Sequence, residues 1–570
     1  MRFGVLEMDP AHNPAVLDTA TWDPAGAAQR VIRSDAAYWE RVRDAAANDL
    51  PLPSGAGLVP HTASCSRLCG RLLFLVSLDD GQQVFVELGS DEPLLGQPLI
   101  SRPLAPGVYL AAHAADAPTV HRFVTASGRS PRPLGPIPRL GVGTRMTTAV
   151  WPAIYNAMAD GGFAANAIQN SVREVNLLAD LLAGAAPESN YAFSFGSIES
   201  GYTGSSFEGL WVAGTLEGLK HPAALRFGAD ADHIQVKRGP GGLARAKQVI
   251  EAARHYTFFT LDISDILDYG ALSADDGQAR AYLEAHLSDA AQRAEVLAYH
   301  ASSPGAGATD MELDAAAVGR LVGKYWLALD AVEELAETVQ KVREGGAFDL
   351  ELSMDEHPPE ISTSECLTSA LELRFVLAEA ARRGVALTHV APNFGVEKGT
   401  DYRLPDGLVG LERRMRALQV VADAWGVLLD VHSGDDLSAA TRGAIRRATD
   451  GRLHFKVSPM LQLLFGQVLE EHHPALFRRW WDDALAYARC EAEGGSPLAS
   501  ACLREAEARG WTPSAHDSVF HHYGFRYVGR RDAHGQFPQR EEFYSLSEGF
   551  YRAYQERVER YLGTLAAELF

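Results

Sequence analysis

The 570-residue chain has few cysteines, a deficit of positive charge and no long apolar run. Five cysteines cannot build a disulfide framework, and Cys65 and Cys69 have no second pair nearby to complete a zinc site. No stretch approaches about 18 consecutive apolar residues, which excludes a membrane-spanning helix. Lysine and arginine number 52 against 73 acidic residues, and a net charge of −21 would repel nucleic-acid phosphates and anionic lipid.

Nucleotide-binding and serine-hydrolase motifs are also missing. The nearest approach to a phosphate loop, Gly141–Met146, lacks the third glycine of the dinucleotide pattern and follows a proline-rich stretch instead of a strand. Neither a G-x-x-x-x-G-K-[ST] loop nor a G-x-S-x-G elbow occurs. The N-terminus lacks a basic segment followed by an apolar core. We therefore expect a cytoplasmic protein with no nucleotide cofactor and no nucleic-acid or membrane partner.

Composition and length indicate a globular protein of more than one domain. A hydrophobic fraction of 46% and a charged fraction of 22% are ordinary for an enzyme. Two β-rich runs, Arg71–Val76 and Gln83–Leu88, flank Asp80-Gly81 and predict a hairpin. The proline-rich stretch Ser130–Arg139 ends regular structure. We place a domain boundary there, between an N-terminal α/β extension (residues 1–140) and a catalytic domain (residues 141–570).

The catalytic domain alternates short apolar runs with helical segments such as Ser369–Arg383. This alternation, repeated about eight times, predicts a TIM-type (β/α)8 barrel, with an open doubly wound sheet as the alternative. A helical insert near residues 278–343 and a final helix at Glu548–Phe570 complete the domain. The eight candidate strands are Tyr191–Gly196, Leu225–Ala229, Phe258–Ile263, Phe348–Ser353, Ala386–Ala391, Gly426–Val431, Leu453–Val457 and Ser518–His522.

Polar residues follow or end nearly every candidate strand, where the active sites of such barrels lie. Loops after strands are often polar for no functional reason, but histidine at four of these ends favours an active site. These residues are Asp230, Asp232, His233, Asp262, Ser264, Asp355, Glu356, His389, Asn393, His432, Ser433, Lys456, Ser458, His521 and His522.

Three histidines on separate strand ends predict a metal site. A single histidine on a strand is more often structural, but His233, His389 and His432 occupy equivalent ends of three strands. Mixed imidazole and carboxylate ligands suit zinc, manganese, cobalt or nickel. Of His521 and His522, at most one would face the barrel centre, because adjacent residues on a strand point to opposite faces.

Two carboxylates are candidates for acid and base. Asp232 and Glu356 lie after different strands, so their surroundings can hold them in different protonation states. Alternatively, Asp232 could cap a helix and Glu356 could pair with an arginine.

Two further stretches, and a lysine on a candidate strand of the barrel, suit an anionic sugar. The turn after His432, beginning at Ser433, can present backbone N–H groups to a ligand. Lys456 could bind a substrate carboxylate, neutralise a neighbouring aspartate or form a Schiff base. The segment Asn393–Tyr402, which includes Lys398, is rich in the polar groups that sugar binding requires.

Several separated motifs resemble the tagaturonate epimerase family. They are Ala391–Lys398 (APNFGVEK), Asp430–Gly434 (DVHSG) and Asp230–His233 (DADH), and the resemblance extends from about residue 140 to the C-terminus. It implies a TIM-barrel enzyme that interconverts tagaturonate and fructuronate with a divalent metal. By this resemblance Asp232 would be the base, Glu356 the acid, and His233, His389 and His432 the metal ligands.

The chain departs from the family pattern at two places. Thr144 precedes Arg145 where an aspartate is expected, and the segment Asn166–Asn176 has diverged. The resemblance therefore defines the reaction class more firmly than the sugar, and a related ketohexose remains open.

The reaction itself restricts the mechanism. The inverted carbon is β to the ketone, so its C–H is not acidified by that carbonyl and enolisation cannot epimerise it. Transient oxidation would need a dinucleotide, for which no motif exists, so retro-aldol cleavage and re-addition is favoured. A metal would stabilise the enediolate, and Lys456 or Arg145 would hold the substrate carboxylate.

Two other classes of function compete with this one. A metal-dependent aldolase or keto-aldose isomerase would use similar residues, but an isomerase would exchange solvent deuterium next to the carbonyl. A non-catalytic sugar-acid binding protein would be expected to lose the histidines and carboxylates, which are present here. The sequence leaves the oligomeric state open, and a homo-oligomer could form through the helical insert.

Overall fold

Eight parallel strands close into a barrel, which confirms the predicted fold and excludes the open sheet. The computed structural model describes residues 1–570 except 193–195, 303–312, 357–360 and 398. The strands, in their order around the barrel, are β10 (Ala165–Ser171), β13 (Phe227–Gln235), β14 (Phe258–Asp262), β15 (Asp349–Met354), β16 (His389–Pro392), β17 (Leu428–Val431), β18 (Leu453–Val457) and β9 (Arg139–Gly143).

The barrel strands are buried almost completely, because helices cover their outer face and side chains fill the interior. Apolar side chains alone do not fill that interior. Charged and polar residues such as Asp230, Glu351 and Lys456 are at most 3% exposed. The barrel interior therefore contains ionisable side chains as well as apolar ones.

Two of the predicted barrel strands are wrong. Ser518–His522 forms the short helix α17 (Ser518–Tyr523), which Asp517 begins by accepting a hydrogen bond from the backbone N–H of Phe520. Tyr191–Gly196 coincides with β11 (Ser189–Ala192) and the start of β12 (Gly196–Glu199), a separate hairpin, and its residues 193–195 lie outside the described residues.

The two strands that replace them, β9 and β10, lack an ordinary strand composition. β9 reads RLGVG, and a Cβ at Gly141 would clash with the side chains of Gln169 and His454. Glycine is required there because its neighbours inside the barrel are large. β10 reads ANAIQNS. Its Asn166, Gln169 and Asn170 are buried, but such polar residues are typical of a loop, so the sequence gives no strand pattern here.

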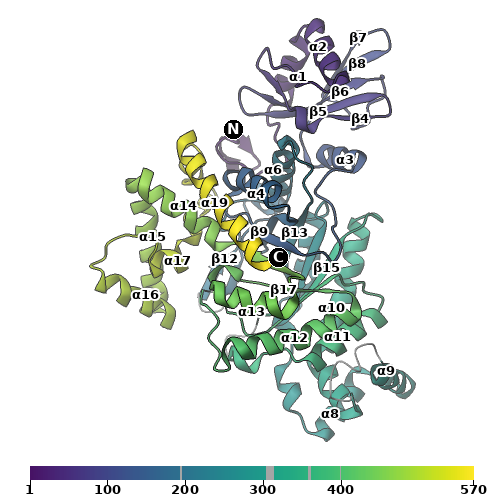
Figure 1. Cartoon of the computed structure of the whole chain (residues 1–570), viewed down its shortest axis with the longest axis vertical. Coiled ribbons are helices and arrows are strands. Elements are labelled where there is room, and N and C mark those ends of the chain that lie inside the picture. The colour runs from purple at the N-terminus through teal and green to yellow at the C-terminus, as the bar shows by residue number, and fades with distance from the viewer. Residues whose placement is uncertain (193–195, 303–312, 357–360, 398) are drawn as a thin grey trace.

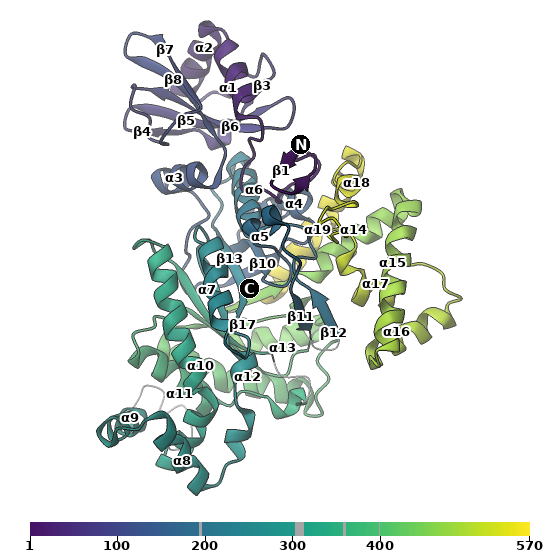
Figure 2. The same ribbon diagram turned by 180° about the vertical axis from the view of Figure 1, so that it is seen from behind.

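Helices surround the barrel (Figures 1 and 2), and α11 (Ala370–Arg382) shows how the sequence defines them. Ser369 and Glu372 form a capping box at its start, and Gly384 follows its end with a positive φ of 77°. One or two helices follow each of five other strands. They are α4 (Thr147–Gly161) after β9, α5 (Leu178–Ala183) and α6 (Phe207–Lys220) after β10, α7 (Gly242–Ala252) after β13, α12 (Gly407–Trp425) after β16 and α13 (Ala439–Thr449) after β17.

Two helical insertions extend the barrel. Between β14 and β15 lie α8 (Asp276–His286), α9 (Ala290–Ser302) and α10 (Ala315–Val342). After β18 come α14 (Pro459–His472), α15 (Pro474–Glu493), α16 (Pro497–Ala508), α17, α18 (Arg540–Phe543) and α19 (Glu548–Leu569). Figure 1 shows α15, α16 and α17 projecting to one side of the barrel, while α19 packs along α4 and α14.

The N-terminal part carries its own sheet and its own hydrophobic core. The sheet pairs β3 (Leu58–Pro60), β5 (Arg71–Leu78), β6 (Gln83–Gly89), β8 (Val108–Ala114) and β7 (Ile100–Ala105), with β4 (Ser66–Leu68) alongside β5. Its core includes Trp39 from α2 (Ala36–Ala47) and Val31 from α1 (Pro24–Arg33), separate from the barrel core. A two-stranded pair, β1 (Arg2–Phe3) and β2 (Leu6–Glu7), begins the chain, and α3 (Ala117–Ser127) leads into the barrel.

Among the described residues, no helix combines the length and the apolar character needed to cross a membrane.

Candidate active site

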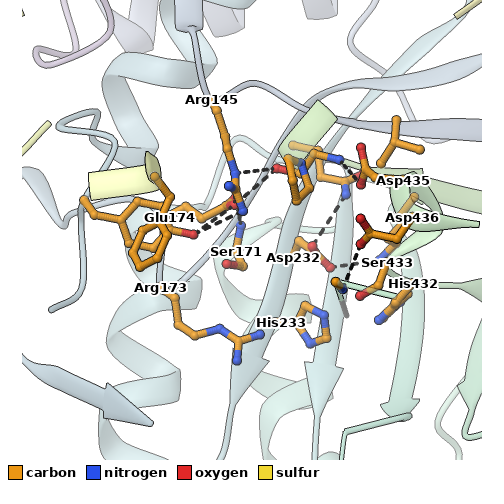
Figure 3. A pocket seen from close by; sticks show the side chains of 18 of the residues that line it. Arg145, Ser171, Arg173, Glu174, Asp232, His233, His432, Ser433, Asp435 and Asp436 are labelled. Atoms are coloured by element: carbon orange, nitrogen blue, oxygen red, sulfur yellow. Dashed lines mark hydrogen bonds and ion pairs between the residues drawn. The ribbon is translucent and has the colours of Figure 1, made fainter. Parts of the chain in front are cut away.

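A pocket opens at the carboxyl end of the barrel strands, where the sequence predicted the active site (Figure 3). In that view Arg145 and Glu174 lie on one side, Asp435 and Asp436 on the other, and Asp232 and His233 between them. The full lining comprises Arg145, Gln169, Ser171, Arg173, Glu174, Ile198, Tyr202, Asp232, His233, Gly399, His432, Ser433, Asp435, Asp436, Lys456, Val457, Ser458, Pro459, His521, His522 and Phe525.

Lys456, on β18, lies at the floor of the pocket and is surrounded by carboxylates. Its Nζ lies 2.9 Å from Asp232 Oδ1, 2.7 Å from Glu351 Oε2 and 3.2 Å from Asp230 Oδ2. A fourth carboxylate, Asp430, is 3.9 Å away. Burial disfavours the ammonium ion, but these carboxylates outweigh burial and raise the pKa of Lys456 well above its usual value. A Schiff-base role is therefore disfavoured, because it needs the neutral amine.

The carboxylates around Lys456 hold different protonation states. Burial would raise the pKa of Asp232, but Lys456, His233 and His432 together lower it below its usual value. Asp230, one layer deeper on the same strand, has a pKa of about 7, because burial and the neighbouring carboxylates outweigh Lys456. Asp232 is thus an anion at the pocket surface, which is the state a general base needs.

His233 and His432 meet at the pocket, with ring centroids 4.6 Å apart. Nδ1 of His233 lies 3.0 Å from Asp262 Oδ2, and Nε2 of His432 lies 2.7 Å from Glu351 Oε1. Each ring is therefore oriented by a carboxylate through one nitrogen, the arrangement usual for metal-binding histidines. His233 also has a positive φ of 47° where β13 changes register against β14. Residues held in such conformations are found most often at active sites and ligand sites.

The residues at this point fit a divalent cation. One ligand atom from each of Asp232, His233 and His432 lies within 4.8 Å of the others, and all three residues are buried. Asp355 Oδ1 lies 3.1 Å from Nδ1 of His432, which places two electron-pair donors side by side. Burial opposes the imidazolium ion, but Asp355 and Glu351 raise the pKa of His432 to about 10. The carboxylates therefore favour a positive charge at His432, and the donor atoms around it are of the kinds that bind a divalent cation.

His389 does not join the other two histidines. It begins β16 and pairs in register with Leu428, four residues before His432, a separation of about 13 Å along a strand. Its ring contacts Phe258 and His454, at centroid distances of 4.8 Å and 5.6 Å, inside the barrel. β16 ends at Pro392, one residue after the predicted end, so His389 lies three residues before the carboxyl end of the strand and stays inside the barrel.

Glu356 is bound to an arginine, the structural alternative considered for it. Arg173 donates to both of its carboxylate oxygens, and Gln235 Nε2 lies 3.4 Å from Oε2. Glu356 is not among the residues that line the pocket, whereas Arg173 is. This pair holds the end of β15 against the segment after β10.

The predicted substrate-binding residues fall into three groups. Arg145, Ser433 and Lys456 line the pocket. Asn393 is buried and donates from Nδ2 to the backbone carbonyl of Asp355 at 2.8 Å, so it positions a loop behind the pocket. Lys398 lies outside the described residues.

Sequence reasoning missed several lining residues. Arg173 and Glu174 follow β10, the strand that its polar residues concealed, and Glu174 pairs with Arg145 at 2.9 Å. The diverged segment Asn166–Asn176 was the available signal. His521 and His522 both line the pocket, because they lie on a helix and not on a strand. Tyr202 belongs to a loop with no motif, whereas Asp435 lies in the turn after His432, which the sequence singled out for its backbone N–H groups and not for this carboxylate.

Fold and site together define a TIM-barrel enzyme whose pocket suits a small, oxygen-rich, charged molecule. A family model described as tagaturonate epimerase (UxaE) matches residues 196–493, just over half of the chain. The chain belongs to the tagaturonate epimerase family, and it is an isomerase of that type.

Solved structures agree with the fold. The native structure of fructuronate-tagaturonate epimerase UxaE from Cohnella laeviribosi is similar with a TM-score of 0.63 and 20% sequence identity, over 90% of this chain and 96% of that one. A glycerol complex of the same enzyme gives a TM-score of 0.59 and 20% identity, over 90% of this chain and 95% of that one. No curated protein sequence matches the chain significantly.

Proposed function

We propose that the protein is a metal-dependent epimerase that interconverts D-tagaturonate and D-fructuronate by retro-aldol cleavage and re-addition. The observation that carries this proposal is the family match across β13 to β18, the strands that supply Asp232, His233, His432 and Lys456. A related ketohexose is the alternative substrate, and an aldolase or keto-aldose isomerase is the alternative activity.

Arg145 is the residue best suited to the substrate carboxylate. Its guanidinium lines the pocket, and its Nε lies 2.9 Å from Glu174 and 3.0 Å from Ser458 Oγ, which fix its orientation. Arginine binds carboxylates in a planar, bidentate geometry. Lys456 is less suited, because its ammonium is already surrounded by carboxylates of the protein.

Asp232 would act as base on the hydroxyl of the carbon to be inverted. Removal of that proton allows the hydroxyl carbon to become an aldehyde as its bond to the neighbouring carbon breaks, and the electron pair moves into an enediolate. Re-addition to the other face of the aldehyde gives the epimer. Asp232 is ionised, 8% exposed and held by Lys456, so it reaches the pocket in the required state.

His233 and His432 would hold the metal ion. Asp232 lies within 4.8 Å of both histidines, and Asp355 lies 3.1 Å from Nδ1 of His432. We assign the carboxylate ligand to Asp355, so that Asp232 remains available as the base. Zinc, manganese, cobalt and nickel all suit this set of donors. When bound, such an ion supplies Lewis-acid stabilisation of the negative oxygen of the enediolate.

Removal of the metal is expected to abolish turnover. The protein is treated with a chelator, reconstituted separately with zinc, manganese, cobalt or nickel, and assayed for fructuronate formed from tagaturonate in D2O. We expect loss of activity, recovery with at least one ion, and product without deuterium next to the carbonyl. Deuterium at that carbon would indicate an isomerase, and metal binding without turnover would reject the proposed substrate.

His389 and His432 are expected to differ in their effect on metal content. His432→Ala should lower the bound metal per chain, because it removes a ligand, whereas His389→Ala should leave it unchanged, because this ring lies deeper in the barrel. Elemental analysis of both variants after the same reconstitution measures this directly. Loss of metal from His389→Ala would restore the ligand set expected from the sequence.

A further inference from the structure

Epimerisation through an aldehyde needs proton exchange at two positions, and this inference rests on the proposed function. The aldehyde must turn between cleavage and re-addition, so its oxygen occupies opposite sides of the reacting carbon in the two epimers. A single carboxylate on the pocket floor reaches one of these positions. A second acid/base group must therefore line the same pocket on another side.

Three acidic residues near the pocket have their oxygens committed elsewhere. Glu356 accepts hydrogen bonds from Arg173 through both oxygens. Glu174 pairs with Arg145 at 2.9 Å and accepts from Asn170 Nδ2 at 2.8 Å. Asp435 accepts from the backbone N–H groups of residues 458 and 460, at 2.8 Å and 3.0 Å. Each of them shapes the site and is poorly placed to transfer protons.

His521 differs from these groups because its partner, Asp436, contacts only one of its two ring nitrogens, and the other can exchange a proton with a substrate. Its Nε2 lies 2.8 Å from Asp436 Oδ1, and its side chain is 30% exposed in the pocket lining. Asp436 is itself 8% exposed, and its Oδ2 accepts from the backbone N–H of Gly399 at 2.8 Å. The Asp436 carboxylate thereby directs a proton to Nε2 and leaves Nδ1 as the basic nitrogen.

The fold brings His521 to the pocket from a different direction than Asp232. Asp232 rises from the barrel on β13, whereas His521 lies on α17, in the helical extension that follows β18. Asp436 comes from the loop after β17, on the opposite side of the pocket from Glu174 in Figure 3. The two groups thus approach a bound substrate from the barrel floor and from the helical extension.

We propose that His521, oriented by Asp436, is the second acid/base residue of the reaction. For one epimer Asp232 takes the hydroxyl proton, the C–C bond pair forms the enediolate, and the hydroxyl carbon becomes the aldehyde. After the aldehyde turns, the enediolate carbon attacks its other face and the new alkoxide takes a proton from Nδ1 of His521. The reverse reaction begins with deprotonation by His521, and no oxidant or reductant is needed.

Replacement of His521 tests this assignment. His521→Gln is expected to lower kcat by about 10²–10⁴-fold in both directions with little change in KM and in metal content. His521→Ala should lose as much activity and regain part of it when imidazole is added to the assay. The matched control is His516→Gln, an exposed histidine outside the pocket lining, which should retain wild-type kinetics.

The outcomes separate this inference from the proposed function. If the wild type and His516→Gln interconvert the two sugars and His521→Gln does so equally fast, the assignment of His521 is wrong while the function stands. A rise in KM at unchanged kcat would make His521 a binding residue and would likewise overturn the assignment. If the metal-loaded wild type turns over neither sugar, the proposed function fails and this inference with it.

Discussion

Replacing Lys456 by methionine is expected to lower the free energy of unfolding by about 3–5 kcal/mol, the usual cost of removing one partner from a buried ion pair. Lys456 is 3% exposed and pairs with Asp232, Glu351 and Asp230 at once. Without its ammonium these carboxylates would be buried together with less compensating charge. Urea unfolding of the wild type and the variant at pH 8 measures the difference.

The difference in free energy of unfolding between the wild type and Lys456→Met should become smaller as the pH falls from 8 towards 5. Loss of the cation raises the pKa values of the folded-state carboxylates above their unfolded values, so the folded variant binds more protons and gains stability on acidification. Lys247→Met is the matched control, because Lys247 forms an exposed pair with Glu334 that is worth at most about 1 kcal/mol. Equal unfolding midpoints for the Lys456 variant and the wild type would contradict the electrostatic role of this lysine.

Replacing Asp232 by asparagine is expected to lower kcat by about 10²–10⁴-fold in both directions, since asparagine keeps the shape but cannot accept the substrate proton. Asp232 is the ionised carboxylate that lines the pocket beside His233 and Lys456. Steady-state kinetics with each sugar measures the loss of kcat, and elemental analysis of the same sample measures the bound metal.

The metal content of Asp232→Asn separates two roles for this residue. We expect bound metal close to the wild-type amount, because His233, His432 and Asp355 are the proposed ligands. Asp160→Asn, at an exposed position on α4, serves as the matched control and should retain full activity. Loss of metal together with activity would instead assign Asp232 to metal binding and contradict its role as the base.

Prediction of the pocket-lining residues worked where a polar residue followed a clearly apolar strand. Asp232, His233, His432 and Lys456 all lie next to or on such strands and meet at the pocket. It failed where the strand was itself polar or glycine-rich. β9 and β10 carry Gly141, Asn166 and Gln169 inside the barrel, so their periodicity gave no strand signal and Arg173 was missed.

The depth of a residue in its strand also has to be known. His389 is the first residue of β16 and lies three residues before its carboxyl end, and at about 3.3 Å per residue this depth keeps its ring in the barrel interior, below the pocket. Predicting the segment around His521 as a strand was a separate error. On a helix both His521 and His522 can face the same cavity.

The sequence by itself determined the (β/α)8 class, the acidic character of the protein and the family, because hydrophobic periodicity, composition and short motifs are local properties. Tertiary structure decided which charged groups share a pocket. It placed Lys456 among carboxylates from three other strands, paired Glu356 with Arg173 and brought His521 from the C-terminal helices to Asp436. Such pairings depend on distances between residues far apart in the chain, and barrel closure and helix packing set those distances.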